Sequence, residues 1–158
     1  KKLKSIDIDE EFIFASMLLD LSDNHKYFFH KYNLSNQVVN NINIYAKLLK
    51  EIKFNKNFFG KDLKKNIFFY GKENIKKILV INKVINKKNL NTKTNESLTN
   101  INNVLIPKFP VTGKDLIREG IKSGKQIGKI LKIIENKWIE NDFKINKEEI
   151  NFLLQKNI

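Results

Sequence analysis

The chain contains no cysteine and only one arginine, two prolines and six glycines among its 158 residues. Without cysteine it forms no disulfide and no zinc site with thiolate ligands, a composition compatible with the cytoplasm, where we expect the protein. A long hydrophobic run is also absent. The longest apolar stretch, Phe12–Leu21, is interrupted by Ser16 and Asp20. It is too short to cross a bilayer, so we expect no membrane-spanning segment.

The scarce residue types gather in one segment of the chain. Elsewhere lysine, asparagine and isoleucine dominate, the residues that an A+T-rich coding sequence produces by default. Proline, glycine and arginine need G+C-rich codons, so their clustering indicates that the backbone and a contact surface require them there. The segment contains both prolines, the single arginine and four of the six glycines: Pro107, Pro110, Gly113, Arg118, Gly120, Gly124 and Gly128.

Positive charge is concentrated in the middle of the chain. Residues 1–49 contain six lysines and six acidic residues, whereas residues 50–93 contain thirteen lysines and three acidic residues. A net charge of +13 distributed in this way favours a polyanionic partner, either nucleic acid or an anionic membrane surface. Codon bias is the alternative explanation of the charge. It does not explain why the first third, equally rich in asparagine and isoleucine, is neutral.

The spacing of apolar residues predicts an all-α fold, because they recur with helical periodicity and no strand pattern of useful length is present. Ser35 is a plausible N-cap for a helix that extends to Ile52, and Asp9 for an earlier helix. Further helices are expected at 23–32, at 63–70 with Gly71 as the stop, and at 75–85.

We therefore expect two helical parts. An irregular multi-helix body occupies residues 1–93 and is incomplete at its N-terminus, because the chain begins with lysine rather than methionine. Residues 94–106 form a linker or weak helix, and residues 107–158 form a smaller helical tail subdomain.

The tail begins with specific local signals. Thr112 precedes Asp115 by three residues, as in a capping box, and starts a short helix that ends at Gly120. Ser123 and Gln126 repeat the arrangement for a longer helix. That helix has an apolar face and an opposite face containing Lys125, Lys129 and Lys132. The apolar face consists of Ile127, Ile130, Leu131, Ile134 and Trp138.

Two hypotheses account for the glycines of this longer helix. In the first, the glycines are only caps and packing sites: Gly124 and Gly128 lie one turn apart, so another backbone can approach the helix closely. Alternatively, the free amides at the helix N-terminus combine with Lys122 and Lys125 to bind phosphate. The sequence leaves both open.

The tail resembles a known signature. FPVTGKDLIREGIKSGKQIGKILKIIENKWIEND is similar to the C-terminal tail of bacterial CCA-adding tRNA nucleotidyltransferases and their poly(A) polymerase relatives. Lys125 stands where that family often has proline. More loosely, the helix start at 34–36 and the segment 64–79 resemble the family's body domain. The signature is matched by Phe109, Pro110, Gly113, Asp115, Leu116, Gly120, Gly124, Gly128 and Leu131.

The resemblance implies a tRNA-binding C-terminal portion that holds the acceptor and T arms while a head domain adds nucleotides to the 3′ end. The family's head binds Mg²⁺ and NTPs through paired aspartates and a glycine-rich loop. This chain offers no such parts: Asp7 and Asp9 have the spacing but no preceding strand or glycine loop, and we interpret Asp9 as a helix cap. We therefore expect no catalytic residue, metal site or cofactor in this chain, and no activity without the N-terminal catalytic domain of the same polypeptide.

The cations expected to contact RNA lie in both parts of the chain, because A-form duplex is recognised mainly by its shape and phosphates. His25 and His30 are expected at surface or boundary positions rather than at a metal. The predicted RNA contacts are Arg118, Lys122, Lys125 and Lys129 in the tail, with Lys64, Lys65, Lys76 and Lys77 in the body.

Two other classes of function remain open. The tail also resembles a helix-hairpin-helix, a sequence-neutral DNA- or RNA-binding module, although Lys122 and Ser123 separate its glycines. A helical protein-interaction domain is the second. We expect no membrane partner, because Gly128 and the register of Trp138 fit internal packing better than a membrane-surface helix.

Overall fold

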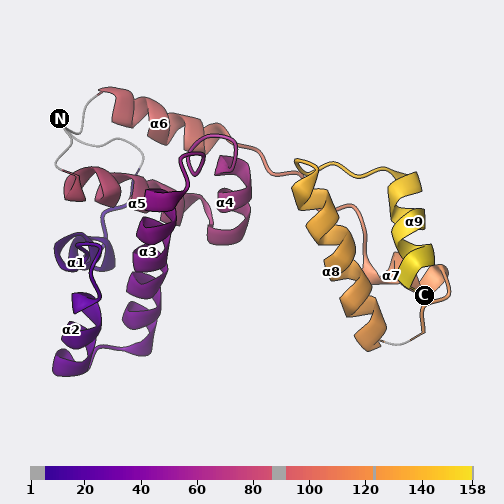
Figure 1. Cartoon of the computed structure of the whole chain (residues 1–158), viewed down its shortest axis with the longest axis horizontal. Helices are drawn as coiled ribbons and strands as arrows, with labels where there is room; N and C mark the ends of the chain where they lie inside the picture. The colour runs from indigo at the N-terminus through magenta and orange to yellow at the C-terminus, as the bar shows by residue number, and fades with distance from the viewer. Residues whose placement is uncertain (1–5, 87–91, 123, 158) are drawn as a thin grey trace. The chain divides into compact units, whose positions relative to one another are not determined.

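The computed structural model describes residues 6–86, 92–122 and 124–157, and all regular structure in these ranges is helical (Figure 1). This confirms the all-α prediction. The chain divides into two compact units, Lys1–Val104 and Leu105–Ile158. The helices are α1 (Glu10–Leu18), α2 (Asn24–Tyr32), α3 (Asn36–Phe54), α4 (Leu63–Tyr70), α5 (Lys72–Ile85), α6 (Thr92–Asn103), α7 (Gly113–Arg118), α8 (Gly124–Glu140) and α9 (Lys147–Asn157).

The helix boundaries of the first unit follow the predicted caps. The Phe12 amide donates to Asp9 Oδ1 at 2.8 Å at the start of α1, and the Val38 amide donates to Ser35 Oγ at 3.4 Å at the start of α3. Gly71 separates α4 from α5 with a φ of 80°, a backbone conformation that residues with a Cβ rarely adopt. Asp9, Ser35 and Gly71 are thus confirmed in their predicted roles.

Helix α5 forms the centre of the first unit. It contacts α1, α3, α4 and α6, and its residues from Ile75 to Ile81 are all buried. Helix α3 contributes a buried face that includes Ile42, Leu48 and Leu49. A helix that is buried nearly all round is typical of the middle of a helical core.

Helix α6 belongs to this core. Leu98 and Ile101 are buried, and α6 packs against α5. The segment expected as a linker or weak helix, 94–106, therefore contains most of a packed helix. Because this segment is poor in charge and rich in asparagine, its composition does not indicate that Leu98 and Ile101 are buried.

The second unit packs α8 against α7 and α9. The predicted capping box is present, because Thr112 and Asp115 each accept from the other's backbone amide, and Gly120 has a φ of 92°. The predicted Ser123 cap lies outside the described residues. The ring of Trp138 packs on Phe109 and Phe143, with centroids 5.2 and 4.9 Å away. The core cluster is Val111, Leu116, Ile121, Ile130, Ile134 and Leu154.

Across the residues described, no helix is both long enough and apolar enough to cross a membrane.

Candidate nucleic-acid interface

Local contacts define α7 and the start of the turn that follows it. The Thr112 amide donates to Asp115 Oδ2 at 2.8 Å. Hydrogen bonds from the hydroxyl and then the amide of Thr112 hold the pKa of the Asp115 carboxyl below its usual range. After Gly120, Ile121 is buried and its amide donates to the Leu116 carbonyl at 3.1 Å. These contacts fix the backbone from Thr112 to Ile121.

Four predicted RNA contacts surround this turn: Arg118, Lys122, Lys125 and Lys129, all exposed. Arg118 Nη1 lies 3.6 Å from Asp115 Oδ1, but the Arg118 side chain is 79% exposed, and an ion pair in such a position contributes little stability. We find no ion pair for the three lysines within the described part of the chain. Lys125 and Lys129 lie one turn apart on α8 and so share one face of that helix. We call these four exposed cations the tail basic surface.

Gly124 and Gly128 do not serve close packing. A Cβ atom at either position would meet no atom within 4 Å among the described residues, and both glycines are exposed. The expectation that another backbone of this chain approaches them is therefore wrong. Instead they leave a strip of α8 without side chains, next in sequence to Lys125 and Lys129. Such a strip allows a ligand to reach the helix backbone.

The body lysines are arranged differently. Lys65 is exposed and Lys64 half-buried, whereas Lys76 and Lys77 are buried, with only 5% and 7% of their surface exposed. The Lys76 ammonium pairs with Glu73, and the Lys77 ammonium with Asp9. Lys76 and Lys77 were predicted as RNA contacts from their charge alone, but they lie in the most buried stretch of α5. Since both are buried and already paired, the proposed contact surface excludes them.

Asp7 and Asp9 do not form a metal site with neighbouring ligands. The described residues contain no group of three or more His, Cys, Asp or Glu side chains that could hold a metal ion. Asp9 caps α1 and pairs with Lys77. Burial opposes its ionisation, but hydrogen bonds from Lys77 and from the Phe12 amide outweigh this and lower the pKa of Asp9.

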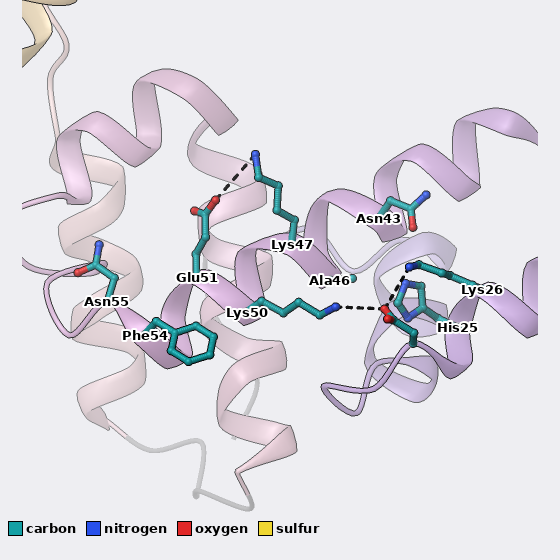
Figure 2. Close-up of a pocket in the computed structure, with 10 residues that line it drawn as sticks. His25, Lys26, Asn43, Ala46, Lys47, Lys50, Glu51, Phe54 and Asn55 are labelled. Carbon is teal, nitrogen blue, oxygen red and sulfur yellow. Dashed lines mark hydrogen bonds and ion pairs between the residues drawn. The ribbon is translucent and has the colours of Figure 1, made fainter.

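A pocket that the sequence interpretation did not anticipate lies between α2 and α3 (Figure 2). We call it the α2–α3 pocket; its volume is about 710 Å³. One wall is a face of α3 and the other is the start of α2. Helical spacing from Asn43 to Phe54 could have indicated the α3 wall, but the α2 wall comes from a separate segment. The pocket is lined by Asp23, His25, Lys26, Asn43, Ala46, Lys47, Lys50, Glu51, Phe54 and Asn55.

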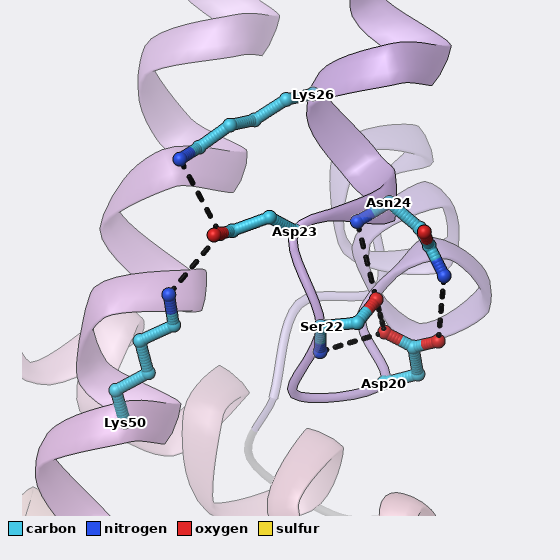
Figure 3. A network of polar contacts seen from close by, with 6 residues as sticks. All are labelled: Asp20, Ser22, Asp23, Asn24, Lys26 and Lys50. Atoms are coloured by element: carbon cyan, nitrogen blue, oxygen red, sulfur yellow. Dashed lines mark hydrogen bonds and ion pairs between the residues drawn. The ribbon is translucent and has the colours of Figure 1, made fainter.

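The start of α2 is held by a polar network (Figure 3). Asp20 accepts hydrogen bonds from the Ser22 hydroxyl and amide, and the Asn24 amide donates to Ser22 Oγ at 3.1 Å. Asp23 Oδ1 lies 3.3 Å from Lys26 Nζ and 3.1 Å from Lys50 Nζ. Through Lys50, this network connects α2 to α3 at the mouth of the pocket.

His25 is buried, with 2% of its surface exposed, contrary to the predicted surface or boundary position. Its ring packs edge-on against Phe29, with centroids 5.5 Å apart. No described residue hydrogen-bonds to its Nδ1. No local sequence pattern signals this burial, because it depends on the packing of α2. His30, by contrast, is exposed.

Comparison with known proteins identifies the family. The model of the family described as tRNA nucleotidyltransferase domain 2 matches residues 7–153, nearly the whole chain. The chain belongs to this family. The resemblance of the tail signature is thus confirmed at the level of the family.

Curated relatives match over shorter segments. The mitochondrial CCA tRNA nucleotidyltransferase 1 of Homo sapiens is 37% identical over 51 residues, and that of Mus musculus 35% over 51 residues. The Danio rerio protein of the same name is 38% identical over 56 residues. These matches cover 32–35% of this chain and only 12–13% of the relatives' length. No solved structure matches the chain.

Proposed function

We propose that this chain is the tRNA-binding C-terminal portion of a CCA-adding tRNA nucleotidyltransferase, holding the acceptor and T arms while a head domain adds nucleotides to the 3′ end. The observation that supports this most strongly is the tail basic surface. Arg118, Lys122, Lys125 and Lys129 are exposed at the end of α7 and the start of α8, beside two glycines of α8 whose Cβ positions are open among the described residues.

The physical properties of duplex RNA suit such a surface. An A-form helix presents phosphates and 2′-hydroxyls rather than readable base edges in its deep groove, so a protein binds it by shape and charge. The amides at the N-terminus of α8 add favourable dipoles for phosphate. Lys64 and Lys65 extend the proposed contacts into the first unit, because Lys65 is exposed and Lys64 partly so.

The chemistry of nucleotide addition belongs, in this proposal, to the N-terminal catalytic domain of the same polypeptide, which would bind Mg²⁺ and NTPs. The described residues offer no cluster of acidic or histidine side chains to hold a metal, so no step of the reaction is assigned to them. The cytoplasmic location expected from the sequence stays a prediction. The vertebrate relatives are named as mitochondrial, so imaging of the tagged protein in its own cells would test it.

Competition binding tests the proposal. We expect the chain to bind a tRNA or a tRNA minihelix more tightly than duplex DNA of equal length, with an affinity that falls steeply as salt rises. Replacing Arg118 and Lys125 together by alanine should weaken tRNA binding roughly tenfold and reduce the salt slope by about 2, because each removed phosphate contact reduces it by about 1.

The matched control removes two positive charges at and beyond the other end of α8. Lys137 lies in the last turn of α8, roughly 20 Å from Gly124 along the helix, and Lys144 follows the end of the helix. Their double alanine variant should bind tRNA nearly as tightly as the parent chain. Equal losses in both variants would mean that net charge alone matters, and equal affinity for DNA and tRNA would favour the helix-hairpin-helix class of function.

A further inference from the structure

The α2–α3 pocket has the size of a ligand site and a mostly polar and charged lining. Its volume of about 710 Å³ lies within the roughly 300–1,000 Å³ typical of small-molecule sites. All its lining residues belong to the first unit, whereas the tail basic surface belongs to the second. Ala46 and Phe54 supply apolar surface, and Asn43 supplies an amide that both donates and accepts hydrogen bonds.

Three lysines line the pocket, and each forms a solvent-exposed ion pair. Lys26 and Lys50 share Asp23, while Lys47 Nζ lies 3.8 Å from Glu51 Oε1 (Figure 2). The side chains of these lysines are 49–64% exposed, and exposed pairs contribute little, so each ammonium can turn to an incoming phosphate. Hydrogen bonding to Tyr70, and then the charge of Glu51, raise the pKa of Lys47 and keep it charged.

Phe54 is more exposed than the other aromatic side chains on the described surface. It is 82% exposed at the C-terminal end of α3, on the rim of the pocket. Lys53 Nζ lies 5.9 Å from the centroid of its ring, and the exposed Lys56 follows two residues later. An exposed aromatic ring among lysines is the combination that binds single-stranded nucleic acid, because the ring stacks on a base while the cations contact the backbone.

His25 adds a hydrogen-bonding group that the fold leaves unused. It is nine-tenths or more buried in the pocket wall, and its Nδ1 has no partner among the described residues. Buried polar atoms in native proteins are ordinarily hydrogen-bonded, so such an atom indicates a missing partner. That atom is itself shielded from solvent, so a nucleotide base reaches it only when the His25 ring turns toward the pocket.

We propose that the α2–α3 pocket binds one unpaired nucleotide of the bound RNA. Its base stacks on Phe54 and contacts the pocket wall at His25 and Asn43, and its flanking phosphates contact Lys47, Lys50 and Lys53. This inference rests on the proposed function, since it assumes that the ligand is RNA. It assigns to the first unit the recognition of a single-stranded nucleotide, whereas the tail basic surface contacts duplex.

The experiment uses the whole chain and two RNA hairpins with the same stem, one blunt and one with a short 3′ single strand that contains 2-aminopurine. We expect the parent chain to bind the second hairpin more tightly and to quench its fluorescence by stacking. Phe54→Ala should weaken binding of that hairpin roughly 5- to 100-fold, abolish the quenching and leave binding of the blunt hairpin unchanged. Phe54→Trp should retain both effects.

Phe69→Ala is the matched control, because Phe69 is also an exposed aromatic residue but does not line the pocket. It should leave both hairpins bound as before. The inference is overturned if Phe54→Ala weakens the binding of neither hairpin, or weakens the binding of both equally. If the Arg118→Ala/Lys125→Ala variant still binds both hairpins less tightly than the parent chain, the proposed function nevertheless stands. If the parent chain binds neither hairpin, both the proposed function and this inference are wrong. Binding of an acidic peptide at the pocket would then indicate a protein partner instead.

Discussion

At the scale of single residues, Asp9 contacts two residues from different parts of the sequence. Its carboxylate caps α1 through the Phe12 amide and pairs with Lys77, sixty-eight positions away on α5. The Lys77 side chain is only 9% exposed, whereas that of Asp9 is 41% exposed. Removing the carboxylate therefore leaves a nearly buried ammonium without its partner, which is more costly than losing an exposed ion pair.

We predict that Asp9→Ala lowers the free energy of unfolding by roughly 2–4 kcal/mol, because the loss of the N-cap adds to the cost of leaving the nearly buried Lys77 ammonium without a partner, a cost reduced by the partial exposure of Asp9. Asp9→Asn should cost less, because asparagine still caps the helix. Urea unfolding followed by circular dichroism measures both. Asp7→Ala is the control, since Asp7 is exposed and forms no hydrogen bond or ion pair with another described residue. Equal losses at Asp7 and Asp9 would contradict the prediction.

The same residue predicts a pH dependence. The pKa of Asp9 is lower in the folded chain than its usual value of 3.8, so its stabilising contribution is present above that value and is lost as the pH falls through the folded pKa. The stability difference between the parent chain and Asp9→Asn should therefore narrow below about pH 4.

At the scale of elements, the stability of α8 and its proposed contact with RNA favour different residues at position 128. Gly128 lies in the helix interior, where glycine is unfavourable, and a Cβ there meets open space among the described residues. Gly128→Ala should therefore stabilise the second unit by about 0.5–1 kcal/mol. If RNA approaches this strip, the same change should weaken tRNA binding. Thermal unfolding and tRNA titration measure the two effects, and a stabilised variant with undiminished affinity would mean that RNA does not contact Gly128.

The helices that the sequence predicts well are those with local signals. Ser35, Thr112 and Gly120 fix helix ends through contacts within a few residues, so their roles can be deduced without knowing the rest of the fold. The burial of α6 and of His25 depends on segments far apart in the sequence, and local patterns do not encode it.

The candidate site divides in the same way. The tail basic surface was predictable, because the turn and the first two turns of α8 are one continuous segment with scarce residue types. The α2–α3 pocket was not, because Asp23 meets Lys50 only when α2 packs beside α3. Lysine identity alone also did not separate Lys65, which is exposed, from Lys77, which is buried and paired.

At the scale of the whole molecule, each unit has its own core. Leu98 and the α5 residues belong to the first unit, and Ile134 and Trp138 belong to the second. Trp138 is the single tryptophan of the chain and is 2% exposed, so its fluorescence reports the unfolding of the second unit alone. Circular dichroism reports the helices of both.

This difference between the two signals allows a test of whether the units unfold separately. Leu98→Ala and Ile134→Ala each remove a fully buried side chain and should cost about 2–5 kcal/mol. We predict that Ile134→Ala shifts the tryptophan transition to lower denaturant, whereas Leu98→Ala shifts only the part of the circular dichroism transition that the tryptophan does not follow. Leu105→Ala, at an 82% exposed position just beyond α6, is the control and should shift neither. If Leu98→Ala moves the tryptophan transition as far as Ile134→Ala does, the chain unfolds as one cooperative unit, because a loss in one core would then be felt equally in the other.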